Sequence, residues 1–149
     1  MHRLTVRKMT AADLDRVVDI WYTTSMQAHH FIPAQYWEKH KQQMKNHYLP
    51  KSEAYVAVYA TTIIGFFALV EDVLAALFVL PAMQGKGIGS LLLKHAKTLR
   101  SSLQLKVYAK NAQSIEFYKK KGFFIRAKTR DESTGEFEFI MEWPASTNS

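Results

Sequence analysis

The apolar residues of this chain fall in short runs that polar or glycine-containing segments separate. Period-two alternation and short apolar runs predict strands, whereas apolar residues three and four positions apart predict helices. By these rules we expect strands over Leu4–Lys8, Tyr55–Tyr59, Ile63–Val70, Val73–Val79, Leu103–Tyr108, Phe123–Thr129 and Phe137–Trp143. We expect a first helix after a capping box at Thr10–Asp13, and further helices over Pro33–Tyr48, Ile88–Arg100 and Ala112–Lys121. Leu49–Ser52 is expected to form a loop.

The order of these elements predicts a mixed α/β fold. It reads β-α-α-β-β-β-α-β-α-β-β, which favours one mixed, twisted sheet with helices on both faces. The length of 149 residues predicts a single domain over 1–149, in which residues 143–149 form a frayed tail.

Composition narrows the class of protein. Hydrophobic residues make up 48% and charged residues 22%, which is ordinary for a globular domain. The absence of cysteine excludes disulfides, a cysteine-based zinc site and a cysteine nucleophile. The six histidines show no metal-ligand spacing, so we expect no metal. Charged residues follow Met1 where a signal peptide would be apolar, and the run Val73–Met83 is too short to cross a bilayer, so we expect a cytoplasmic protein and no membrane partner.

The formal net charge of +7 admits two interpretations. One is a solvated basic surface, and the other is attraction of a polyanion such as a nucleotide cofactor or a nucleic acid. The basic run Lys119–Lys121 lies at a predicted helix end, where the helix dipole favours cations, so it does not require a nucleic-acid partner.

The segment Gln84–Ser90 is the clearest functional signal. It joins a predicted strand to a predicted helix and contains Gly85, Gly87 and Gly89. The first amides of a helix lack carbonyl partners, and glycines let a bulky anion approach the backbone. We therefore expect a phosphate site here, with Lys86 as a further charge contact; the alternative is a glycine-rich turn that binds nothing.

Two common phosphate motifs do not fit this segment. A Walker A loop requires Ser or Thr after its Gly-Lys pair, where this chain has Gly87. A dinucleotide fingerprint requires Gly or Ala where this chain has Ser90, and an acidic residue about 20 positions further on, where the chain reads Leu105-Lys106-Val107.

The spacing that fits is Gln-x-x-Gly-x-Gly, at Gln84, Gly87 and Gly89, after a strand that ends near Pro81. A second block, Val107–Phe123, carries first an Asn, then a Tyr and finally a Gly-Phe pair. Together the two blocks resemble the GNAT superfamily, the GCN5-related N-acetyltransferases, in its small single-domain bacterial form. The resemblance implies the GNAT fold, acetyl-CoA as cofactor, and direct transfer of an acetyl group to a primary amine in a ternary complex. The lack of cysteine agrees with direct transfer.

The resemblance also implies roles for individual residues. Tyr118 would lie beside the thioester sulfur and donate a hydrogen bond or a proton to the departing thiolate; the alternative is a core aromatic. Asn111 would reach the cofactor arm, cap the following helix, or do both. The residues expected to bind the cofactor through backbone or side chain are Phe78, Val79, Leu80, Gln84, Gly85, Lys86, Gly87, Ile88, Gly89, Ser90, Asn111, Ser114 and Tyr118.

The resemblance also implies residues on the acceptor side. Glu71 follows the strand Ile63–Val70, close to where the family often places its general base; a solvated strand-end glutamate is the alternative. His29, His30 and Phe31 lie between the first two helices and would border the acceptor pocket, where one histidine would contact or deprotonate the amine; a surface loop is the alternative.

Several functional questions stay open at this stage. The acceptor is a small-molecule amine or a lysine of a peptide or protein, and the chain is a monomer or a homodimer. Other functions on the same fold are transfer of a different acyl group, a non-catalytic CoA sensor and a nucleic-acid-binding module.

Overall fold

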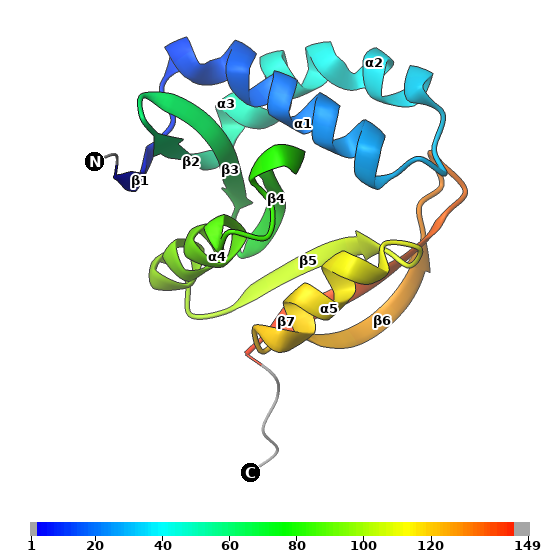
Figure 1. Ribbon diagram of the computed structural model, residues 1–149. Helices are drawn as coiled ribbons and strands as arrows, with labels where there is room; N and C mark the ends of the chain where they lie inside the picture. The colour runs from blue at the N-terminus through cyan, green and yellow to red at the C-terminus, as the bar shows by residue number, and fades with distance from the viewer. Residues whose placement is uncertain (1–2, 145–149) are drawn as a thin grey trace. The chain divides into compact units, whose positions relative to one another are not determined.

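The structure, a computed structural model, describes residues 3–144 (Figure 1). The chain divides after Leu99 into two compact units, the N-terminal unit and the C-terminal unit. The predicted order of strands and longer helices is confirmed, as is the mixed α/β class. That the two units form one domain stays a prediction. Trp143, placed in the expected tail, is instead the last residue of a strand, and residues 145–149 lie outside the described residues.

The N-terminal unit is built on four antiparallel strands. Its strands pair in chain order and are β1 (Leu4–Lys8), β2 (Glu53–Tyr59), β3 (Thr62–Val70) and β4 (Val73–Val79). From Ile63 to Leu69 every residue of β3 is buried. A strand that is apolar on both sides needs cover on both faces, and the helices α1 (Leu14–Ala28) and α4 (Ile88–Leu99) both contact β3 and β4.

The second half of the helical region differs from the prediction. The expected helix Pro33–Tyr48 is α2 (Ala34–Gln43) followed by a π-helical turn, Met44–Tyr48. The helical path continues as α3 (Leu49–Lys51), so the loop predicted at Leu49–Ser52 is wrong over its first three residues. Leu49 is buried, which holds the chain against the core, and Pro50 lies at the start of α3, where proline is tolerated.

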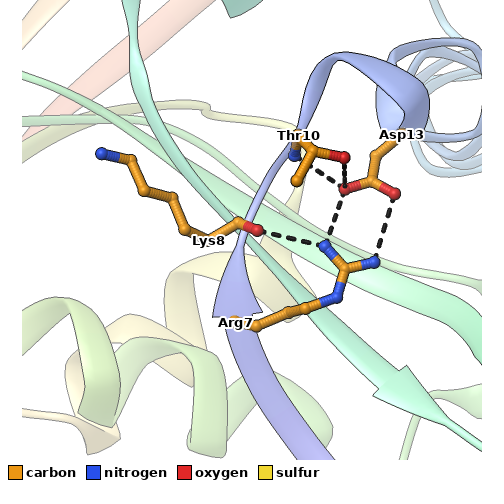
Figure 2. Close-up of polar contacts among 4 residues, drawn as sticks. All are labelled: Arg7, Lys8, Thr10 and Asp13. Atoms are coloured by element: carbon orange, nitrogen blue, oxygen red, sulfur yellow. Dashed lines mark hydrogen bonds and ion pairs between the residues drawn. The ribbon is translucent and has the colours of Figure 1, made fainter.

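An ion pair joins β1 to the start of α1 (Figure 2). The Arg7 guanidinium donates to both carboxylate oxygens of Asp13, at 2.8 and 3.2 Å. The Thr10 amide also donates to Asp13, at 2.8 Å, which confirms the predicted capping interaction. The hydrogen bonds from Arg7, together with those from Thr10 and against the effect of burial, lower the pKa of Asp13 to about 2.

The C-terminal unit is a three-stranded antiparallel sheet with one helix. The strand β7 (Phe137–Trp143) pairs on one side with β5 (Leu103–Tyr108) and on the other with β6 (Phe124–Arg130). The helix α5 (Ala112–Lys120) lies along one face of these strands (Figure 1). The predicted stop at Gly122 is confirmed: its φ is +93°, and a Cβ there would lie 3.2 Å from Cδ1 of Trp143.

Candidate functional site

The glycine loop of the N-terminal unit leads from the end of β4 into α4. After a short 3₁₀ turn at Pro81–Met83, Gly85 and Gly87 have φ of +78° and +83°. A Cβ at either glycine would meet nothing within 4 Å. Glycine is therefore required here by backbone conformation and not by crowding inside the protein, which leaves open space in front of the loop.

The amides of this loop are available to a ligand. The Gln84 amide donates to Pro81 and the Leu91 amide donates to Gly87, but from Gly85 to Ser90 no amide donates to an acceptor within residues 3–144. No acidic residue lies in the first turn of α4 to offset the positive end of its dipole. Free amides, a helix N-terminus and open space together fit the diphosphate of a CoA-type cofactor.

Packing inside the N-terminal unit holds the loop in place. Ile88, the first residue of α4, is buried, so its side chain is an anchor and only its backbone can face a ligand. Gly65 of β3 lies opposite Val79, and a Cβ there would lie 2.8 Å from the Phe78 carbonyl oxygen and 3.3 Å from Leu92 Cδ1. This close approach of α4 to β3 and β4 fixes where the helix begins.

The polar groups at the end of β4 are partly occupied within the unit. The Gln84 side chain donates to the Val79 carbonyl at 3.0 Å, and the Leu80 amide donates to Ile64 at 2.9 Å. Gln84 therefore ties the loop to the strand end. The Val79 carbonyl and the Leu80 amide, which are among the backbone groups expected to pair with a cofactor arm, are thus already hydrogen-bonded.

In the C-terminal unit, Asn111 has the capping role. Its side-chain oxygen accepts from the Ser114 amide at 3.2 Å, and its own amide donates to the Tyr108 carbonyl at 2.9 Å. The helix-cap interpretation is confirmed, and the cofactor contact stays a prediction. Ser114 is half-buried in the first turn of α5, next to this cap.

Tyr118 lies on the buried face of α5. Its ring contacts Phe117 and Phe123, with centroids 5.2 and 5.4 Å away. Burial raises the pKa of the phenol above its ordinary value, so the hydroxyl stays protonated at neutral pH. That hydroxyl has no hydrogen-bond partner in the described part of the chain. The side chain thus combines the core-aromatic role with an available O–H donor.

The expected acceptor segment contains one buried and one exposed histidine. His29 packs between Phe31 and Trp37, with ring centroids 5.8 and 5.5 Å away, and burial lowers its pKa to about 4. It is therefore neutral at pH 7 and a weak base. His30 is exposed and Phe31 half-buried, so the surface-loop alternative holds for His30 and not for His29.

Three buried polar groups near His29 were missed from the sequence. They have no hydrogen-bond partner in residues 3–144 and are Thr24 Oγ1, Ser25 Oγ and Trp37 Nε1. Thr24 and Ser25 continue the buried stripe of α1 beyond Trp21. The signal in the sequence that could have revealed Thr24 and Ser25 is that they occupy positions on the buried face of α1, where apolar residues are expected.

Glu71 lies apart from the glycine loop. It is exposed at the turn between β3 and β4, with φ of +53°. The loop follows the opposite end of β4, so the strand Val73–Val79 separates them, a span of about 20 Å at about 3.3 Å per residue. This separation does not test Glu71 as a base, because a base acts at the thioester end of the cofactor, so that role stays a prediction.

Residues 3–144 contain no group of three His, Asp or Glu placed to hold a metal ion. Within the same range, no helix has the length and apolarity needed to cross a membrane.

Comparisons with known proteins give the family. Residues 50–124 match the model of the acetyltransferase (GNAT) domain. The chain is 30% identical over 140 residues to the peptidyl-lysine N-acetyltransferase YiaC of Escherichia coli, covering 93% of this chain and 96% of that protein. It is 28% identical over 134 residues to the peptidyl-lysine N-acetyltransferase YjaB of Salmonella typhimurium, covering 89% and 92%.

A solved structure agrees in fold. The solution structure of apo-form YjaB from Escherichia coli matches with a TM-score of 0.85 and 25% identity, covering 97% of this chain and 99% of that chain. The family-model match spans both predicted motifs, the glycine loop and the Asn-to-Phe block. The chain belongs to the GNAT family of acetyltransferases.

Proposed function

We propose that this acetyltransferase moves the acetyl group of acetyl-CoA to the ε-amino group of a lysine in a peptide or protein. The observation that carries the proposal is the run of unpaired amides from Gly85 to Ser90 at the start of α4, in a chain of the GNAT family. Bound acetyl-CoA would supply an acetyl group activated as a thioester.

The N-terminal unit would hold the diphosphate. The backbone from Gly85 to Ser90 supplies donors, and the exposed Lys86 supplies a positive charge beside them. The backbone of Phe78, Val79 and Leu80 would pair with the cofactor arm. It would use the N–H and C=O groups other than the Leu80 amide, which is bonded to Ile64, and the Val79 carbonyl, which is bonded to Gln84. Gln84 acts by anchoring the loop to the strand.

The C-terminal unit would act on the thiol end. We assign Asn111 and Ser114 to the cofactor arm and Tyr118 to the leaving sulfur. Because burial raises the pKa of Tyr118, its hydroxyl is a weaker acid than the thiol of CoA, whose ordinary pKa is about 8.5. Tyr118 therefore stabilises the thiolate mainly by donating a hydrogen bond, and complete proton transfer costs more.

The acceptor assignment draws on the relatives and on the segment around His29. YiaC and YjaB are named peptidyl-lysine N-acetyltransferases. His29, His30 and Phe31 would contact the acceptor. Glu71, exposed at the turn between β3 and β4, stays the base predicted from the sequence.

The test is thiol release from acetyl-CoA with two sets of acceptors. One set contains lysine peptides with blocked N-termini, and the other contains small amines without a peptide backbone. We expect release with the peptides and a mass increase on the lysine side chain. Turnover restricted to small amines would refute the lysine assignment, and CoA binding without turnover would refute the enzyme.

A further inference from the structure

A lysine acceptor arrives as an ammonium, with an ordinary pKa of about 10.4, and must lose a proton before its nitrogen can attack. This inference rests on the proposed function, because it concerns the group that takes that proton. The sequence offered one of His29 and His30, and Glu71, which is exposed at the turn between β3 and β4. A carboxylate that is partly buried and lacks a partner would be a stronger base.

Glu138 on β7 meets this description. It is half-buried, and its carboxylate has no hydrogen-bond or ion-pair partner within residues 3–144. Burial is the main cause that raises the pKa of its carboxyl, repulsion by Asp131 adds to it, and Lys106 opposes it. Asp13, Glu38 and Asp131 differ, because their pKa values are lowered by donors that hold them.

The strand register places Glu138 in a polar row. It lies opposite Tyr108 of β5 on one side and opposite Thr129 of β6 on the other. Residues directly opposite in antiparallel strands point to the same face, with Cβ atoms about 4.5–5.5 Å apart. Thr129 Oγ1 is buried and has no hydrogen-bond partner in the described residues. The row therefore has a half-buried carboxylate next to a buried hydroxyl, and neither side chain is hydrogen-bonded to another described group.

The neighbouring hairpin turn keeps a negative charge beside this row. The Tyr108 hydroxyl donates to Asp131 Oδ2 at 2.8 Å, while the Ser133 amide and hydroxyl donate to Oδ1 at 3.0 and 2.7 Å. Burial opposes ionisation of Asp131, but these hydrogen bonds outweigh it and lower its pKa. Asp131 thus stays ionised and makes Glu138 a better proton acceptor.

The same strand pair leads into α5, whose N-cap Asn111 and whose residues Ser114 and Tyr118 are the predicted cofactor residues of this unit. The Ala109 amide donates to the Phe137 carbonyl at 2.9 Å, and the Asn111 amide donates to the Tyr108 carbonyl at 2.9 Å. Glu138 is therefore one residue from the backbone bond that holds the segment before Asn111, the cap of the helix that bears Tyr118.

We infer that Glu138 is the general base of the reaction and that Asp131, held by the Tyr108 hydroxyl, tunes it. In this step an N–H bond of the acceptor ammonium breaks and an O–H bond forms on Glu138, which leaves a nitrogen lone pair. That nitrogen bonds to the acetyl carbon as the carbon–sulfur bond breaks. The second amine proton leaves with the thiol product, and Glu138 releases its proton to water.

The test compares Glu138→Gln with Glu132→Gln, an equal charge change on an exposed residue of the same hairpin. Activity with one acceptor is followed from neutral to alkaline pH, with CoA affinity and thermal unfolding as controls. We expect Glu138→Gln to lose about 10²-fold in kcat near neutral pH, a usual contribution of general-base catalysis, with CoA affinity unchanged. Its kcat/KM should rise about tenfold per pH unit as the free amine forms, whereas the wild type and Glu132→Gln stay nearly flat.

A second measurement does not depend on activity or on that variant folding. In the protein without ligands, carboxyl NMR should show Glu138 titrating above an ordinary glutamate, and Asp131→Asn should lower its pKa. The inference is overturned if Glu138 has an ordinary glutamate pKa that Asp131→Asn does not change. It is also overturned if the pH profile of kcat/KM for Glu138→Gln is parallel to that of the wild type. If the wild type turns over and Glu138→Gln has the same activity, only the assignment of Glu138 as the base is wrong. If the wild type acetylates no amine, the proposed function is wrong as well.

Discussion

Replacing Gly87 by alanine separates a folding effect from a ligand effect. The φ of +83° at Gly87 costs an L-residue about 1–2 kcal/mol. A Cβ there would meet nothing within 4 Å, so no packing penalty is added in the free protein. With a diphosphate on the loop, the new methyl group would enter space that the ligand needs.

Gly135 is the matched control for this variant. Its φ is +79°, it lies in the turn between β6 and β7, and a Cβ there would come no closer than 3.8 Å, to Arg130 Nη2. Gly135→Ala therefore carries the same backbone strain at a position outside the glycine loop. Both variants should lose about 1–2 kcal/mol of unfolding free energy in urea denaturation.

Calorimetric titration with CoA then distinguishes the two variants. We expect Gly87→Ala to weaken CoA binding at least tenfold, about 1.4 kcal/mol, and Gly135→Ala to bind like the wild type. If Gly87→Ala loses stability but keeps the affinity of Gly135→Ala, the loop amides do not hold the diphosphate. A loss in both variants would mean that strain, and not blocked space, lowers the affinity.

Three further predictions follow from single contacts. Tyr118→Phe should lower kcat about 10–10²-fold while leaving thermal stability and CoA affinity near wild type, because the hydroxyl has no partner in the described residues; an unchanged kcat contradicts its role. Asp13→Asn should lower the unfolding free energy by about 1–2 kcal/mol at neutral pH in urea denaturation, after allowance for the half-exposed Arg7. Because the pKa of Asp13 in the folded protein is depressed to about 2, this deficit should vanish as the pH falls from about 5 to below 2. A deficit that stays constant with pH contradicts the ion pair. Gly65→Ala should cost about 1–3 kcal/mol, since its Cβ would lie 2.8 Å from the Phe78 carbonyl oxygen, and a neutral effect in denaturation would show that β4 can move away.

The features that the sequence predicted well are local ones. The glycine loop, the Asn111 cap and the stop at Gly122 each depend on residues within a few positions of one another. Their backbone requirements, a positive φ or a short side-chain acceptor, limit the residue types that can occupy them. Spacing alone was therefore enough to place the loop before α4 and the cap before α5.

Burial in the connection between α1 and α2 could not be predicted in the same way. His29 and His30 are identical neighbours in a predicted loop, yet one packs against Trp37 and the other is exposed. The difference arises from how α2 lies on α1, a tertiary contact that no local pattern encodes. The continuation through Leu49 is similar, because core packing outweighed the proline beside it.

The general base shows the same limit most clearly. The family resemblance selects Glu71, at the end of a predicted strand. Register instead selects Glu138, which lies between Tyr108 and Thr129 only when β5, β7 and β6 pair as they do. A shift of one residue in β7 would turn the carboxylate to the opposite face and separate it from Tyr108. The base strength of Glu138 also depends on Asp131, whose charge the Tyr108 hydroxyl helps to hold. The base is thus a property of three paired strands and one turn, and a sequence read one segment at a time does not contain it.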